Sequence, residues 1–146
     1  MINRENGLLE IYERIKAKRI ELGLTSFKRT PTNPIKEPDM PCVFMMEGID
    51  NIVKHSSRGN TGYPCTRALE VELEIVVNKS VDIMALYRQL RSVVFTSRDG
   101  SGMKNARLSD GTSIRENRTE GPTGYGLPDV KGMSLFLDMI YTDNDL

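Results

Sequence analysis

Two cysteines and one histidine, Cys42, Cys65 and His55, are the side chains of this sequence best suited to chemistry. Thiolates and imidazoles are common zinc ligands, and structural zinc sites usually bring them in close pairs. Here the three residues are separated by 13 and 10 positions, with no Cys-x-x-Cys pair and no obvious fourth ligand. The spacing therefore does not favour a metal site. Cys42 is instead expected to be a buried strand residue.

A cysteine–histidine nucleophile pair is the second chemistry that these residues allow. His55 lies between Lys54 and Ser56, and no carboxylate that could orient its ring is close in sequence. A solvated surface histidine is the simpler interpretation. The glycine-rich segments 100–102 and 124–126 lack the pattern of a Rossmann turn or a P-loop. We expect no catalytic residue, no metal, no cofactor and no enzymatic activity.

Glu70, Glu72 and Glu74 alternate with apolar residues, so all three side chains are expected on one face of a strand. The strand rise places neighbouring carboxylates about 6–7 Å apart. Carboxylates can act in acid–base catalysis, but this also requires a pocket and shifted pKa values. A solvated face, or a strip that meets basic groups, is the simpler interpretation.

Two amphipathic helices are predicted, at residues 4–22 and 81–96. Their apolar stripes at helical spacing consist of Leu8, Ile11, Tyr12, Ile15 and Leu22 in the first helix and Ile83, Leu86, Tyr87, Leu90 and Val94 in the second. Gly23 is a suitable stop for the first helix, and Ser80 is expected to cap the second.

Four strands are predicted, at residues 42–53, 67–77, 112–119 and 130–141. The first begins with a continuous apolar run, which indicates burial on both faces. The last carries apolar residues on both faces and is expected to be central, whereas residues 112–119 are polar and typical of an edge. The fold class is therefore α+β, with a largely antiparallel sheet of about four strands packed against the two helices.

Long loops connect these elements, at residues 24–41, 57–65, 97–111 and 120–128. The first contains four prolines and is expected to be an extended arm outside the sheet. Loops of this length usually serve binding. The length of 146 residues fits one domain, residues 1–146, with long loops projecting from it.

The charge balance is neutral, with 20 basic and 20 acidic residues. A dedicated nucleic-acid module is a third alternative, but such modules usually show a basic excess, so specific DNA binding is not indicated. No apolar stretch approaches the roughly 20 residues that cross a bilayer. We expect a reducing cytoplasm, where both cysteines stay as thiols.

The order of the segments carries a resemblance. Four stretches carry it. One strand begins with Pro41-Cys42-Val43-Phe44, and the strand after a long hairpin reads Arg67-Ala68-Leu69-Glu70-Val71-Glu72-Leu73-Glu74-Ile75-Val76-Val77. A helix begins at Asp82 and contains Leu86-Tyr87 and Leu90, and the closing strand contains Leu135-Phe136-Leu137-Asp138-Met139-Ile140-Tyr141. Over nearly the whole chain this pattern is similar to the tail terminator proteins of long-tailed bacteriophages.

The resemblance implies a structural virion protein, assembled in the host cytoplasm and located at the tail–neck junction. It implies a homo-hexameric ring that caps the tail tube, stops tube polymerisation and contacts the neck or connector protein. In contractile tails the ring would also engage the sheath protein. Genomic DNA would only pass through the lumen, and no membrane is involved. The family has no catalytic residues to carry over.

The polar residues expected at the interfaces lie on the carboxylate row, on the exposed side of the second helix and in the loops. They are Arg58, Tyr63, Glu70, Glu72, Glu74, Arg88, Arg91, Arg98, Lys104 and Tyr125. Two alternative functions remain open. One is a head–tail connector or tail-completion protein of the neck, and the other is a small ligand-binding or enzymatic α+β domain with a pocket near His55 or Cys65.

Overall fold

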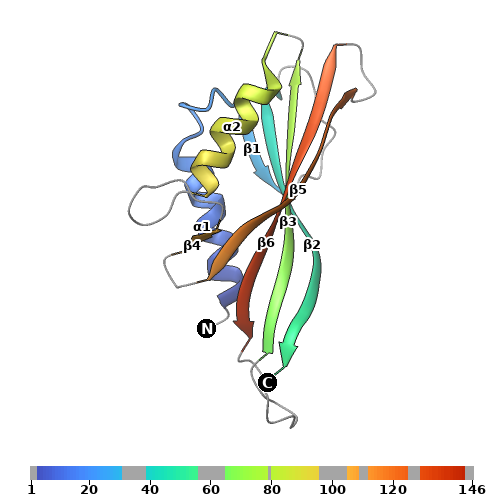
Figure 1. The fold of residues 1–146 in the computed structure, drawn as a ribbon. Helices are drawn as coiled ribbons and strands as arrows, with labels where there is room; N and C mark the ends of the chain where they lie inside the picture. Colours follow the sequence, from blue (N-terminus) through green and yellow to red (C-terminus); the bar gives the residue numbers. More distant parts are fainter. Residues whose placement is uncertain are drawn as a thin grey trace.

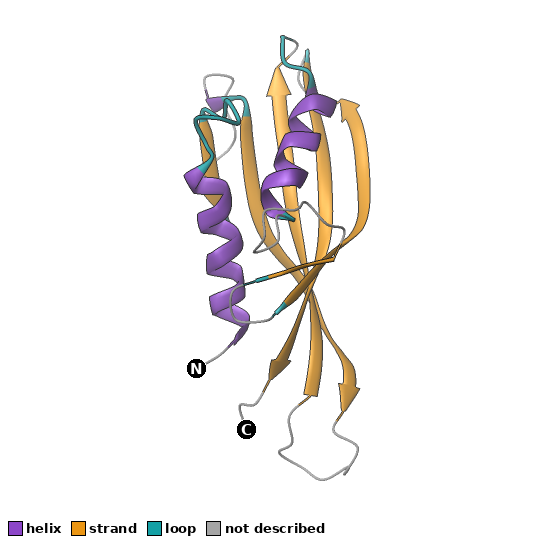
Figure 2. Ribbon diagram, turned by 60° about the vertical axis from the view of Figure 1, so that its left-hand side comes forward, coloured by secondary structure: helices purple, strands orange, loops and turns teal. Residues whose placement is uncertain are grey.

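The computed structural model describes residues 3–30, 39–55, 65–78, 80–95, 105–108, 112–124 and 129–143. Two helices, α1 (Asn3–Ala17) and α2 (Ile83–Val94), lie together on one face of a single sheet (Figures 1 and 2). The sheet has six strands within the described residues. The predicted α+β class is confirmed.

The strands follow the spatial order β1-β2-β3-β6-β5-β4. Their bounds are β1 (Ser26–Arg29), β2 (Cys42–His55), β3 (Cys65–Asn78), β4 (Asn105–Arg107), β5 (Ser113–Gly124) and β6 (Val130–Asp143). All pairs are antiparallel except β1 with β2, which is parallel. Strand β6, which corresponds to the predicted strand at residues 130–141, lies between β3 and β5 and is central, as predicted.

Strand β1 corrects the prediction that residues 24–41 form an arm outside the sheet. The first proline of that segment is Pro31, so Ser26–Arg29 keep all their backbone donors and can form a ladder. They pair in register with the start of β2, Ser26 opposite Cys42. Thr25 N also donates to Pro41 O at 2.8 Å, which brings the two segments together.

Strands β4 and β5 correct two predicted loops. Residues 97–111 contain β4, and β5 continues beyond residue 119 to Gly124 instead of ending in a loop. A register shift between Glu120 and Thr123 lets the strand accommodate Pro122. Gly121 has φ +94°, and a Cβ there would lie 2.8 Å from Gly132 O, so only glycine fits this bulge.

The helix ends follow capping rules. The α-helix α1 ends at Ala17, and tighter turns continue to Gly23, which has φ +73°. The predicted helix over residues 4–22 is therefore too long. Gly23 N donates to Ile20 O and Leu24 N donates to Arg19 O, both at 3.0 Å, so Gly23 closes the turns after α1 in a Schellman arrangement and does not end the α-helix itself.

The predicted N-cap of α2 is wrong. Asp82, not Ser80, accepts from Met84 N and Ala85 N at 3.1 and 3.2 Å. Ser80 Oγ instead donates to Asn78 Oδ1 at 2.9 Å.

The main core lies between the helices and the sheet face that they cover. Its largest fully buried side chains are Leu8, Ile11, Ile15, Met45, Leu69, Leu73, Ile75, Leu90, Leu108, Ile114, Leu135 and Leu137. The alternation of β3 therefore places Leu69, Leu73 and Ile75 against the helices, as predicted. Glu70 and Glu72 lie on the opposite face, which neither described helix covers and which we call the open face. A second, smaller cluster of buried residues comprises Met40, Cys42, Phe44, Val76 and Val130. Neither described helix has the length and apolar character to cross a bilayer.

Candidate assembly surfaces

The carboxylate row lies on the open face of β3, and its basic and polar partners come from the same chain. Arg118 on β5 donates to Glu70 at 3.1 Å. Ser134 on β6 donates to Glu72 at 2.6 Å; Ser134 is buried and Glu72 is half-buried. The expected basic neighbour is thus confirmed for Glu70. Whether the row also meets another copy stays a prediction.

Strand β5 adds a polar layer over the open face of β6. The Arg118 guanidinium stacks on the Phe136 ring at 3.8 Å. Arg115 lies 3.5 Å from the Asp138 carboxylate, which also accepts from Asn117 at 3.3 Å. Because the Arg118 guanidinium contacts both the Glu70 carboxylate and the Phe136 ring, its position above the sheet is fixed.

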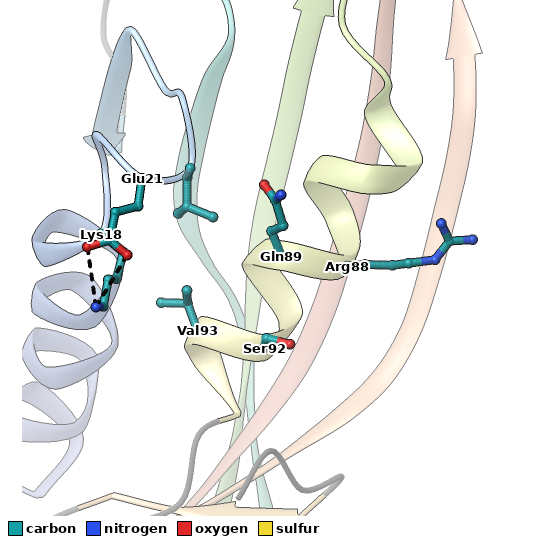
Figure 3. Close-up of a pocket in the computed structure, with 7 residues that line it drawn as sticks. Lys18, Glu21, Arg88, Gln89, Ser92 and Val93 are labelled. Atoms are coloured by element: carbon teal, nitrogen blue, oxygen red, sulfur yellow. Dashed lines mark hydrogen bonds and ion pairs between the residues drawn. The ribbon is translucent and has the colours of Figure 1, made fainter. Parts of the chain in front are cut away.

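Of the two arginines predicted at an interface on α2, one is already engaged within the chain. Arg91 is half-buried and pairs with Glu116 on β5, which also accepts from the Tyr87 hydroxyl at 2.9 Å. Burial and the hydrogen bond to Glu116 raise the pKa of Tyr87. Arg88 is exposed and has no ion-pair partner among the described residues. The Arg88 side chain points away from α1 (Figure 3).

A groove separates the turns that follow α1 from α2 (Figure 3). Its volume is about 440 Å³. It is lined by Lys18, Glu21 and Leu22 on one side and by Arg88, Gln89, Ser92 and Val93 on the other. The close-up shows Gln89 and Val93 projecting from α2 toward the α1 side, while the Lys18–Glu21 ion pair of 3.4 Å borders the groove. We call this feature the helix groove.

Three large aliphatic side chains are exposed along the second half of β2. Ile49, Ile52 and Val53 are 67%, 45% and 60% exposed. Register shifts between Glu47 and Asp50 and after Ile52 interrupt the pairing with β3 in this stretch. β-bulges of this kind re-aim side chains. We call Ile49, Ile52 and Val53 the apolar end of β2.

An ion-pair network anchors this part of β2 to α1, β3 and β6. Asp50 accepts from the Tyr141 hydroxyl at 2.5 Å and from Arg4 Nε at 3.2 Å, and it lies 3.8 Å from Arg67. Arg4 also pairs with Glu47 at 2.7 Å. Burial, followed by the Asp50 contact, raises the pKa of Tyr141. Since four elements meet at Asp50, the apolar end of β2 is held in a defined position.

Both free sheet edges carry features that disfavour strand addition. Strand β1 covers only Cys42–Met45 of β2, and β4 covers only 113–115 of β5, within the part of the chain that the structure describes. The uncovered remainder of β2 contains two register shifts, and that of β5 contains two register shifts and Pro122. Bulges and proline protect edges from pairing.

The three residues weighed as zinc ligands are not brought together. Cys42 begins β2 and His55 ends it, so strand geometry separates them by roughly 40 Å. His55 instead pairs in register with Cys65. Cys42 is fully buried, as predicted, and burial raises the pKa of its thiol to about 11. No cluster of three or more potential metal ligands occurs among the described residues.

Five residues expected at interfaces lie outside the described residues, namely Arg58, Tyr63, Arg98, Lys104 and Tyr125. Conversely, sequence reasoning missed the apolar end of β2 and the helix groove. The sequence does carry a signal for the apolar end of β2. In the segment 48–53, Gly48 and the consecutive pairs Asp50-Asn51 and Ile52-Val53 interrupt the alternation of polar and apolar residues along the strand. The groove depends on how two distant helices pack and has no local signal.

Comparisons with solved structures give a similarity in fold. No protein-family model matches the sequence, and no curated protein does either. Among solved structures, the chain is similar to a chain of the "Virion of native gene transfer agent (GTA) particle", with a TM-score of 0.54 and 11% identity. The match covers 92% of both chains. The two chains therefore share a fold over nearly their whole lengths.

Proposed function

We propose that this chain is a structural protein of a phage-like virion, and that it acts by binding other proteins without catalysing a reaction. The observation that carries the proposal is the fold shared with a chain of a gene transfer agent virion along 92% of each chain. A single compact chain that matches a virion component nearly end to end fits a part of an assembly.

More specifically, the chain forms a ring that caps the tail tube, stops its polymerisation and joins the tail to the neck. The resemblance of the order of segments in the sequence to tail terminator proteins supports this assignment. A closed ring requires two different surfaces on each copy, related by a rotation.

The partners follow from this position. Copies of the chain surround a lumen through which DNA passes, the tail tube protein lies on one side, and the neck or connector protein lies on the other. A sheath protein joins them in a contractile tail. The neutral net charge is compatible with close packing of identical copies, since they do not repel strongly. Membrane contact has no part in this function.

Tail-tube growth in vitro tests the proposal. Purified tube protein is polymerised with and without this chain, and tube lengths are measured by electron microscopy with gold-labelled chain. A terminator shortens the tubes in proportion to its concentration and labels one end only. Tubes of unchanged length with unlabelled ends would contradict tube capping. Binding to the isolated neck or portal complex alone would reassign the chain to the connector.

A further inference from the structure

We propose that a chain of alternating charges acts as one clamp, which holds β1 on the apolar start of β2 and releases it when the charges are screened. We call its six side chains the charge clamp. In order along the chain of contacts they are Glu5, Arg29, Glu47, Arg4, Asp50 and Arg67. This inference goes beyond the proposed function and does not depend on a ring.

The charge clamp is continuous across α1, β1 and β2. Both terminal nitrogens of Arg29 on β1 donate to Glu5 of α1, at 2.8 and 3.2 Å. Arg29 also donates to Glu47 on β2 at 3.3 Å. Arg4 of α1 lies 2.7 Å from the same Glu47 carboxylate. Arg4 Nε then donates to Asp50 at 3.2 Å, so each carboxylate of the series meets only cations of the series.

The inner members of the charge clamp, which extend from Arg29 to Asp50, each have two partners of opposite charge. Their side chains are 22% to 33% exposed, so these charges are screened only at high ionic strength. The hydrogen bond from Arg29 lowers the pKa of Glu5, as expected for a carboxylate that is held ionised. An isolated surface pair contributes little, whereas a network of partly buried charges couples its members.

Strand β1 depends on the charge clamp at its end. It has only four residues and pairs with β2 alone within the described residues. Its beginning is held by other contacts, since Thr25 Oγ1 donates to Met40 O at 2.9 Å. In its middle, Phe27 stacks on Tyr12 of α1 with the ring centroids 5.0 Å apart. Arg29 is the last residue of β1, so the charge clamp fixes the end of the strand.

The part of β2 that β1 covers is the part that has no protection of its own. The four side chains of Cys42–Met45 are all buried, and no register shift interrupts β2 before Glu47. The remainder of β2 carries both register shifts. A regular, apolar strand edge readily pairs with other chains. The charge clamp therefore keeps this edge covered.

Amide exchange in Arg4→Met, followed by NMR, tests the coupling. Arg4 lies on α1, and β1 contains no carboxylate with which it could pair. The reporter of β1 is Thr30 N, which donates to Met45 O at 2.9 Å beyond the end of the strand. The reporter of global unfolding is the amide of Leu135 on the central strand β6.

In the wild type, Thr30 should exchange much faster than Leu135, because β1 opens while the rest of the sheet stays folded. Arg4→Met should speed the exchange of Thr30 about tenfold, in keeping with the loss of hydrogen bonds between charged groups. In an Arg29→Met background the same substitution should leave Thr30 unchanged, since the charge clamp no longer reaches β1.

Two controls accompany these variants. Lys18→Met removes the exposed pair with Glu21 and should not alter Thr30 exchange. The wild type in 1 M NaCl, where the Debye length is about 3 Å, should show Thr30 exchange faster by about threefold or more. The variant that lacks both Arg4 and Arg29 should not respond in this way. The salt measurement on the wild type requires no variant to fold.

Three results would overturn the charge clamp. Thr30 exchange that is unchanged in Arg4→Met would show that β1 opens without breaking the Arg4 contacts. An effect of Arg4→Met that persists in the Arg29→Met background would show a different route of coupling. Wild-type exchange as slow at Thr30 as at Leu135 would show that β1 opens only when the whole fold does.

Discussion

Asp50 connects more elements than any other side chain described above. Its carboxylate receives Tyr141 from β6 and Arg4 from α1, and it lies close to Arg67 on β3. The sequence offers no hint of this cluster, because its members are up to 137 positions apart and meet only through the strand register. By contrast, the burial of Cys42 could be predicted from its apolar neighbours alone.

Tyr141→Phe should reveal the Asp50 contact through the pH dependence of stability. The pKa of Tyr141 is raised in the folded protein, so the stabilisation is complete below the unfolded value of about 10 and is lost as pH rises through the folded value. Urea unfolding between pH 8 and pH 11 should therefore show a steeper loss of unfolding free energy in the wild type than in the variant. Tyr87, whose pKa is also raised, leaves a residual slope in both.

At neutral pH, Tyr141→Phe should lower the unfolding free energy by about 1.5–3 kcal/mol, the usual contribution of a hydrogen bond to a charged group. Identical pH slopes in the two proteins would contradict the assigned contact.

The two cysteines should differ in reactivity. Cys42 is fully buried and its thiol pKa is about 11, so only about 0.1% would be thiolate at pH 8 even with free access. Cys65 is half-buried. Iodoacetamide at pH 8 should modify Cys65 much faster, as followed by peptide mass spectrometry, and urea should remove most of the difference. Equal rates in the folded protein would argue against the buried position of Cys42.

The carboxylate row shows how far local pattern reaches. Alternation correctly predicts that Glu70 and Glu72 share a face, but not that Arg118 and Ser134 lie over them. A charge-reversing substitution at Glu72 would break the hydrogen bond that Glu72 accepts from Ser134 within the chain.

Helix ends illustrate a choice that sequence alone leaves open. Ser80 and Asp82 are both good N-cap residues, two positions apart, and only the backbone decides between them. Gly23 has no such competitor nearby, and its role could be predicted.

Asp82→Ala should lower the unfolding free energy by about 1 kcal/mol, because the first turn of α2 loses its acceptor for Met84 N and Ala85 N. Ser80→Ala is the matched control and should change it by less than about 0.5 kcal/mol. Chemical denaturation measures both. A larger effect at Ser80 than at Asp82 would restore the original capping prediction.

Among the strands, length and period decide what could be predicted. The strands β2, β3 and β6 have 14 residues each, enough for alternation or an apolar run to be recognised. Strands β1 and β4, with four and three residues, are too short to show a period. The full length of β5 could not be predicted, because Pro122 normally argues against a strand. In the structure a bulge accommodates this proline.

Gly121→Ala should destabilise the protein by more than about 1 kcal/mol, because φ +94° is strained for alanine and its Cβ would press on Gly132 O. Gly124→Ala, where a Cβ meets nothing within 4 Å, is the control and should be nearly neutral. Thermal unfolding compares the two. Equal melting temperatures would mean that the bulge is not formed as described.

For the molecule as a whole, the fold and the charge balance independently support the proposal that the chain binds other proteins. A neutral chain with an engaged carboxylate row, protected sheet edges and two unlike exposed surfaces is suited to contacts with other proteins. The helix groove could not be foreseen from sequence, since it depends on the packing of two helices that are distant in the chain, whereas the apolar end of β2 has a local signal in residues 48–53. The chain shares its fold with a chain of a gene transfer agent virion.

The mass of the purified chain in solution tests the central claim most directly. Analytical ultracentrifugation over a wide concentration range should show a closed oligomer of fixed size, close to six times the 16.5 kDa of one chain, that binds the ends of tail tubes. A chain that remains monomeric at roughly 100 μM, about a hundred times a micromolar dissociation constant, and ignores tube ends would contradict it.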